Sequence, residues 1–194
     1  LRGLLGYQQG DNSLAVTCIE QAITQDPSKP HYHFNFGLVM EKEERWDDAI
    51  AAYRQACRLK PAYVEAIANL GNVYRRQRQW KDAITTFQEA LTLKPQSPDL
   101  HNNLGVVYKE KGAPNQALDQ YRQALALAPQ HAEALNNMGV VFQDQGKLAE
   151  SAEAFHQALT LKPAYANAHY HLGLVRLWQA QDAAALSCFQ RSAD

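Results

Sequence analysis

The sequence predicts an all-α fold, a solenoid of stacked antiparallel helix pairs, because one pattern recurs every 34 residues. Two sets of residues show this period. Glycine recurs at Gly3, Gly37, Gly71, Gly105, Gly139 and Gly173, and proline recurs at Pro27, Pro61, Pro95, Pro129 and Pro163. A fixed period of this length, with apolar residues spaced as on two helices, is typical of arrays in which each repeat packs on its neighbours.

The period divides residues 1–194 into the repeats of one predicted solenoid. Residues 1–29 hold a truncated repeat and residues 166–194 hold an incomplete last one. Four full repeats lie between them: 30–63, 64–97, 98–131 and 132–165. The chain opens at Leu1, inside a repeat, so we expect it to be part of a longer protein.

Each repeat is predicted to hold two helices, which in residues 64–97 run over Val64–Gln77 and Lys81–Lys94. The first helix carries a packing stripe of Leu70, Gly71 and Tyr74. A second stripe lies about a quarter-turn away and is polar: Glu65, Asn69, Asn72 and Arg76. The second helix is amphipathic through Ala83, Phe87, Ala90, Leu91 and Leu93. Proline then stops it, because proline has no backbone N–H to donate.

The recurring glycine needs a reason, because glycine inside a helix costs about 0.8–1 kcal/mol relative to alanine. We expect a close approach between helices. The glycine column leaves room for an aromatic column on the second helix, formed by Tyr53, Phe87, Tyr121, Phe155 and Phe189. The pattern indicates packing rather than phosphate binding, since the sequence holds neither GxGxxG nor GxxxxGK[ST].

Composition and charge exclude several classes of function. The net charge of −1 argues against nonspecific nucleic-acid binding, which favours a strongly basic chain. No apolar run approaches the roughly 18–20 residues that span a bilayer, so we predict no membrane insertion. Cys18, Cys57 and Cys188 show neither CxxC nor metal-ligand spacing. They are interpreted as packing residues in a reducing compartment, so we expect a cytoplasmic protein.

The sequence shows no pattern for catalysis or for a cofactor. The pairs His31/His33 and His169/His171 lie at i and i+2, about 160° apart on a helix, where one metal ion cannot use both side chains well. No Ser–His–Asp or paired-carboxylate arrangement stands out. We therefore predict no catalytic site, no metal and no cofactor within these residues.

The columns of this pattern resemble the tetratricopeptide repeat, whose consensus is Trp, Leu-Gly, Tyr, Ala, aromatic, Ala and Pro. The resemblance covers the whole chain and implies a right-handed superhelix with the first helices lining a concave groove. Some positions depart from the consensus. The opening tryptophan column holds His33, Ile67, His101, Leu135 and His169. Ser151 replaces an alanine, and Arg176 stands in the tyrosine column.

In such a superhelix the second stripe of each first helix would face the groove. Asparagines recur along it at Asn35, Asn69, Asn103 and Asn137, followed by His171, with Asn72, Asn102 and Asn136 beside them. Asparagine is a middling helix former, so its recurrence in mid-helix favours a role in binding. Its amide can donate to and accept from a peptide backbone at once. Asparagine is also common at this column of the family, so a structural role stays open.

Apolar and charged residues accompany the asparagines. Leu38, Val106, Val140 and Leu174 would bury the apolar side chains of a ligand. Arg75 and Arg76 form a basic patch, and the region that follows is acidic through Asp99, Glu110, Glu133 and Asp144. The predicted first helix of residues 166–194 gathers several large side chains: Tyr170, His171, Leu174, Leu177 and Trp178. Either a following helix caps them or a partner binds there.

We therefore predict a non-catalytic scaffold that binds an extended segment of a partner protein in its concave groove. The asparagines are also similar to those in the repeat region of O-linked N-acetylglucosamine transferases, where they hold substrate peptides. The alternative is thus the substrate-docking region of a larger enzyme such as a glycosyltransferase. A further alternative is an assembly unit that self-associates through its terminal repeats.

Overall fold

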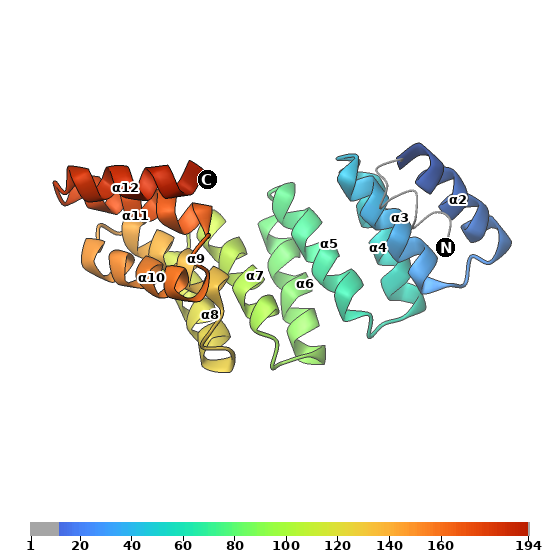
Figure 1. The fold of residues 1–194 in the computed structure, drawn as a ribbon. Coiled ribbons are helices and arrows are strands. Elements are labelled where there is room, and N and C mark those ends of the chain that lie inside the picture. Colours follow the sequence, from blue (N-terminus) through green and yellow to red (C-terminus); the bar gives the residue numbers. More distant parts are fainter. Residues whose placement is uncertain (1–11, 194) are drawn as a thin grey trace. The chain divides into compact units, whose positions relative to one another are not determined.

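The computed structural model describes residues 12–193, and within them the fold is all-α, with eleven helices and no strand (Figure 1). The chain divides into two compact units, Leu1–Pro95 and Gln96–Asp194. Unit 1 contains α2 (Asn12–Gln25), α3 (Pro30–Lys42), α4 (Trp46–Leu59), α5 (Val64–Arg76) and α6 (Trp80–Leu93). Unit 2 contains α7 (Pro98–Glu110), α8 (Pro114–Leu127), α9 (Ala132–Asp144), α10 (Leu148–Leu161), α11 (Ala166–Trp178) and α12 (Asp182–Ala193).

The all-α fold of paired helices is confirmed, and the helix bounds lie close to those that the sequence predicts. The predicted helices Val64–Gln77 and Lys81–Lys94 are found at Val64–Arg76 and Trp80–Leu93. The two helices of a repeat are joined by three-residue turns, such as residues 77–79, and neighbouring pairs within a unit by four-residue connections, such as residues 60–63. The predicted repeat of residues 1–29 lies partly outside the described residues, and Gly3 with it.

The three-residue turns share one backbone conformation. Their middle residue is left-handed, with φ between +56° and +85°, at Glu44, Arg78, Gly112, Gly146 and Ala180. The third residue donates its N–H to the carbonyl oxygen of the residue five positions earlier, as Gln79 does to Tyr74 and Ala113 does to Tyr108, both at 2.8 Å. This is the Schellman arrangement that closes a helix C-terminus. Glycine adopts it without strain, whereas the other three residues do not.

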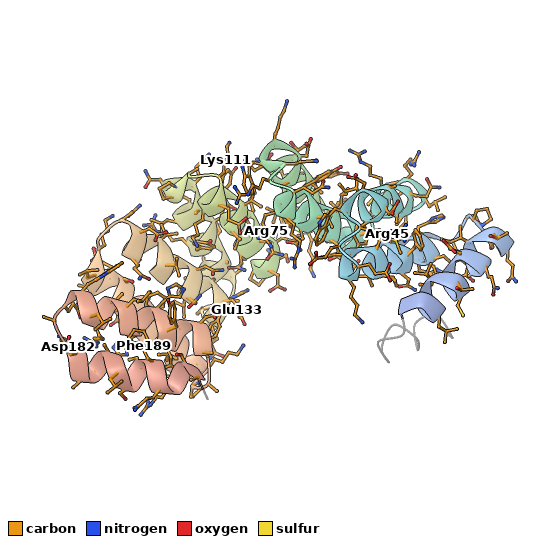
Figure 2. The ribbon with its side chains drawn as sticks, turned by 90° about the horizontal axis from the view of Figure 1, so that it is seen from above. Arg45, Arg75, Lys111, Glu133, Asp182 and Phe189 are labelled. Atoms are coloured by element: carbon orange, nitrogen blue, oxygen red, sulfur yellow. The ribbon has the colours of Figure 1, made fainter. Side chains whose placement is uncertain are left out.

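The glycine column is a close contact, as predicted. A Cβ built on Gly37, Gly105 or Gly173 would lie 2.5–2.6 Å from Cε1 of Tyr53, Tyr121 or Phe189. Gly71 and Gly139 face Phe87 and Phe155 in the same way, at 2.9 and 2.8 Å. Phe189 is labelled on α12 in Figure 2. The aromatic rings of the four earlier pairs are fully buried. The first and second helices of each repeat therefore approach as closely as a missing side chain allows.

In the second helix α6, only three of the five predicted apolar residues are buried. Ala83, Phe87 and Ala90 are fully buried, whereas Leu91 is half-buried and Leu93 is exposed. On a helical wheel Leu91 and Leu93 lie about 80° to either side of the stripe that the other three form. They therefore flank the contact. Leu59, Leu127 and Leu161, which are equivalent to Leu93, are exposed as well.

Residues that depart from the repeat consensus find hydrogen bonds instead. Ser151 is fully buried, and its hydroxyl donates to the carbonyl of Gly139 at 2.8 Å. Arg176, in the tyrosine column, donates to Gln181 Oε1 at 2.8 Å and to His156 Nε2 at 2.8 Å. A buried polar group costs little once it is paired, so these substitutions keep the fold.

His33 and His169, two of the histidines in the tryptophan column, also bond to the backbone. His33 Nε2 lies 2.8 Å from the carbonyl oxygen of Pro27, and His169 Nε2 lies 2.8 Å from that of Pro163. Each histidine thereby satisfies the carbonyl of the proline that follows the preceding helix pair. These bonds give His33 and His169 a structural role.

Gly105→Leu should lower the free energy of unfolding by roughly 1–3 kcal/mol or more, because the new side chain overlaps the Tyr121 ring. Chemical denaturation measures the change. Gln116→Leu, which places the same side chain on an exposed position of α8, is the control and should change stability by less than about 0.5 kcal/mol. Equal stability of the two variants would show that the glycine column is not a close contact.

Arg78→Gly should raise the free energy of unfolding by about 1 kcal/mol, because Arg78 holds a left-handed φ of 57°. Gly112→Ala, at the equivalent turn of the next repeat, should lower it by a similar amount. Thermal unfolding of both variants compares the two signs. A loss of stability in Arg78→Gly would contradict this account of the turn.

Candidate functional site

The second stripe of the first helices forms a partly exposed surface in each unit, which we call the first-helix face. In unit 1 it comprises Asn35, Leu38, Asn69, Asn72, Arg75 and Arg76. In unit 2 it comprises Asn102, Asn103, Val106, Asn136, Asn137, Val140, His171 and Leu174. Most of these side chains are half-buried, Arg76 is exposed, and Asn102, Asn136 and Val140 are buried. The sequence did not distinguish these three buried residues from the rest.

Three of the predicted residues line one pocket of about 370 Å³ in unit 1. The pocket lies between α3 and α5, beside the start of α4. Its walls are Leu38, Glu41, Lys42, Glu44, Trp46, Asn69 and Arg76. An aliphatic side chain, an amide, an indole and charges of both signs thus meet in one place. Such a pocket suits a polypeptide, which carries apolar side chains on a polar backbone.

Arg76 is held in place by two neighbours in this pocket. Its guanidinium lies 5.6 Å from the centre of the Trp46 ring, and its Nε lies 3.9 Å from Oε1 of Glu41. Glu41 in turn accepts a hydrogen bond of 3.0 Å from the Tyr53 hydroxyl. Glu41 and Trp46 were not predicted as site residues. Glu41 lies one helical turn after Leu38, so the helical period could have found it.

The asparagines of the first-helix face divide into two groups. Asn137 donates from Nδ2 to Oδ1 of Asn102 at 3.0 Å, and this bond joins α9 to α7. By contrast, the half-buried Asn35, Asn69, Asn72 and Asn103 make no side-chain hydrogen bond to any other residue within 12–193. Asn137 and Asn102 therefore hold two helices together, while these four amides keep their donors and acceptors available.

Asn136 is a special case among these amides. It is 5% exposed, and its buried Oδ1 has no hydrogen-bond partner in the described part of the chain. Its burial separates it from solvent, unlike Asn103 on the neighbouring helix. Asn136 is therefore less accessible to a ligand than the half-buried amides of this face.

His171 takes the place of the asparagine on α11. Its ring stacks on Phe155, with ring centres 5.6 Å apart and planes 10° from parallel. Its Nδ1 lies 3.1 Å from Oε1 of Gln143, which is buried on α9. Burial lowers the pKa of His171, nearby Lys109 lowers it further, and Asp144 partly opposes them. The imidazole is therefore held neutral at pH 7.

The predicted acidic region of unit 2 is partly neutralised. Glu133 lies 3.4 Å from the Lys162 ammonium, and both Glu133 and Asp99 lie within 4 Å of His131 nitrogens. The Nδ1 of His131 also accepts a hydrogen bond from the N–H of Ala134 and so caps α9. The Lys162 ammonium thereby weakens charge steering by Glu133, while Asp99, Glu133 and Asp144 all stay exposed.

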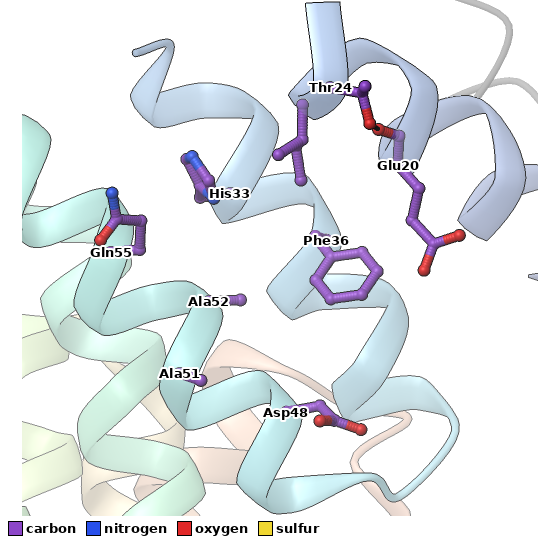
Figure 3. Close-up of a pocket in the computed structure, with 9 residues that line it drawn as sticks. Glu20, Thr24, His33, Phe36, Asp48, Ala51, Ala52 and Gln55 are labelled. Atoms are coloured by element: carbon purple, nitrogen blue, oxygen red, sulfur yellow. Dashed lines mark hydrogen bonds between the residues drawn. The ribbon is translucent and has the colours of Figure 1, made fainter. Parts of the chain in front are cut away.

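Three further pockets lie on the other side of the first helices, between successive second helices. One of about 610 Å³ is lined by residues of α2, α3 and α4, with Ile23, His33 and Phe36 among them (Figure 3). The second pocket lies one repeat later and has Cys57 at the position equivalent to Ile23. The third lies four repeats after the first and has Leu159 at that position. A pocket that recurs in register follows from helix stacking and is not by itself a dedicated site.

Cys57 lines one of these pockets, between α4 and α6. Burial raises its thiol pKa, the Glu89 carboxylate raises it further, and together they bring it to about 11. A thiol with so high a pKa stays protonated and is a poor nucleophile. Among residues 12–193, no group of three or more His, Cys, Asp and Glu side chains could hold a metal ion.

None of the described helices combines the length and the apolarity that crossing a bilayer requires.

Models of the tetratricopeptide repeat match the sequence at residues 42–78, 71–112, 100–164 and 136–193, and together they span 42–193 without a gap. The chain belongs to the tetratricopeptide-repeat family. This fold is typically a non-catalytic scaffold for protein interactions, and nothing in the described residues forms a catalytic site.

Solved tetratricopeptide-repeat structures share the fold. PilW, a widely conserved type IV pilus biogenesis factor, is 19% identical, with a TM-score of 0.85 over 96% of this chain and 86% of its own. YrrB, a protein of this family with an unusual peptide-binding site, is 25% identical, with a TM-score of 0.63 over 90% of each chain. The peroxisomal targeting signal receptor of Saccharomyces cerevisiae is 33% identical over 64 residues, which are 33% of this chain and 10% of the receptor.

Lowering the pH should destabilise the protein through His171, whose pKa in the folded state lies below the ordinary 6.5. As the pH falls through 6.5, the unfolded chain takes up the proton first, so the free energy of unfolding decreases. In the variant His171→Asn this decrease should be smaller. Denaturation of both proteins at pH 7.5, 6.5 and 5.5 measures it, and equal decreases would contradict the assignment.

Proposed function

We propose that the first-helix face binds an extended segment of a partner protein. The observation that carries this proposal is the set of amides without intramolecular partners. Asn35, Asn69 and Asn103 recur at the repeat period, are half-buried, and make no side-chain hydrogen bond within residues 12–193. Each can donate to and accept from a peptide backbone, which every extended segment offers at a regular spacing.

The neighbours of these amides support the same function. In unit 1, Leu38 and Trp46 give the pocket beside Asn69 an apolar wall. In unit 2, Val106 and Leu174 are half-buried on the same columns. Contact with a ligand side chain would contribute about 25 cal/mol for each Å² of apolar surface removed from water. The peptide-binding site of YrrB and the targeting-signal receptor of yeast give precedents among similar proteins.

The proposed partner is a protein or a peptide. The proposal involves no nucleic acid, no cofactor and no insertion into a membrane. We also propose that the protein lies in the cytoplasm. A substrate-docking role in a larger glycosyltransferase would use the same face. It therefore leads to the same expectations for these asparagines.

Peptides selected from a displayed library of random 12-residue sequences test this proposal. The variant Asn69→Ala/Asn103→Ala alters the first-helix face of both units, so a selected peptide should bind it more weakly by at least about 0.5–1.5 kcal/mol, the contribution of one lost hydrogen bond. Folding stability should hold or rise slightly, since alanine is the better helix former. Fluorescence anisotropy and denaturation measure the two quantities.

Asn137→Ala provides a contrast within the same column. It removes the bond to Asn102 and leaves the buried Asn102 oxygen unpaired, so the free energy of unfolding should fall by about 1–3 kcal/mol. If Asn69→Ala/Asn103→Ala also lowers stability and leaves peptide binding intact, the amides are structural and the proposed function is wrong. The same holds if the library yields no binding peptide.

A further inference from the structure

Helix α11 is the first helix of the repeat that begins at Ala166. It exposes more large apolar side chains than the first helices of the earlier repeats. Trp178 is 59% exposed, Tyr170 is 49% exposed, and Leu177 is 44% exposed. His171, Leu174 and Trp178 are spaced by three and four residues, so they form one stripe along α11. We call these three residues the α11 stripe.

Comparison with equivalent positions shows that a following repeat does not cover Trp178. The same position holds Lys42, Arg76, Glu110 and Asp144 in the earlier repeats, and all four are exposed although another repeat follows each of them. Leu186 on α12 behaves differently. It is 60% exposed, whereas three of its four equivalents, Ile50, Leu118 and Ala152, are 8%, 4% and 7% exposed, and the fourth, Ile84, is half-buried.

The two exposed apolar groups therefore have different causes. Leu186 occupies a position that the next helix of an array buries, and the structure describes no helix after α12. Trp178 occupies a position that faces solvent in every described repeat, yet it carries the largest apolar side chain. Burying such a side chain needs a partner outside the array.

His171 shows which hydrogen-bonding group that partner carries. Since Gln143 Oε1 is an acceptor, the neutral imidazole must donate from Nδ1, and its Nε2 is then an acceptor. Within residues 12–193 no group donates to Nε2. A helix has no spare N–H beyond its first turn, whereas an extended segment has one at every second residue. The ring is therefore set to receive an N–H from an extended chain.

We propose that the α11 stripe is the anchor site of the first-helix face in unit 2, where Leu174 and Trp178 bury one large apolar side chain of the bound segment and His171 Nε2 accepts its backbone N–H. This proposal rests on the proposed function and names the residue that the partner must carry. Lys109 and Asp144, one charge of each sign, face His171 from α7 and α9. The site therefore selects for apolar bulk rather than for charge.

The test uses the intact chain and the peptides selected from the random 12-residue library. The selected sequences should share one large apolar residue at a fixed position. Trp178→Ala should weaken binding about tenfold or more, as truncation of a buried aromatic anchor does. Leu186→Ala is the matched control, because it removes an equally exposed apolar side chain outside the stripe, and it should change binding less than about twofold.

Two variants of His171 separate the acceptor from the packing. His171→Phe keeps the ring stacked on Phe155 but has no acceptor, so binding should weaken about two- to tenfold. His171→Gln places an amide acceptor near the position of Nε2 and should bind more tightly than His171→Phe, within about threefold of the wild type. Circular dichroism confirms that each variant is folded.

Each other outcome has a definite meaning. If Asn69→Ala/Asn103→Ala weakens binding and Trp178→Ala does not, the face binds peptides but the α11 stripe is not its anchor. If neither variant changes binding, or no peptide is selected, both proposals are wrong. If sedimentation shows a dimer that Trp178→Ala dissociates, a second copy occupies the stripe and this inference is wrong.

Discussion

The contact between each helical glycine and the aromatic ring of the following helix is the constraint on which the rest of the structure depends. A single added carbon at Gly105 would lie 2.5 Å from the Tyr121 ring, so the two helices have no freedom to move closer. The same contact recurs from Gly37 to Gly173, and it gives each repeat the same pairing of helices. The backbone cost of glycine is offset because the ring is buried completely.

This packing decides which residues remain for binding. The stripe that contains Gly71, Leu70 and Tyr74 is buried against the second helix, so the neighbouring stripe of the first helix is left at the surface. Departures from the repeat consensus are tolerated where a hydrogen bond replaces packing, as at Arg176 and Ser151. Function can therefore vary on the surface stripe while the buried stripe is held constant.

The period predicted the buried side of the structure well. It placed the helices within one residue in the repeat that begins at Val64 and identified the glycine contact, because both follow from residues of one repeat. It did not predict the pairing of Asn137 with Asn102 or the position of Arg76 over Trp46. These contacts join side chains of different repeats, and identical columns gave no reason to treat Asn137 differently from Asn103.

The central claim is that the first helices carry the binding surface. The most direct measurement follows the backbone amide signals of the ¹⁵N-labelled protein by nuclear magnetic resonance while a selected peptide is added. The account predicts that the signals that shift belong to the first helices α3, α5, α7, α9 and α11, with Asn69, Asn103 and Trp178 among them. Shifts confined to the second helices α4, α6, α8, α10 and α12 would contradict it.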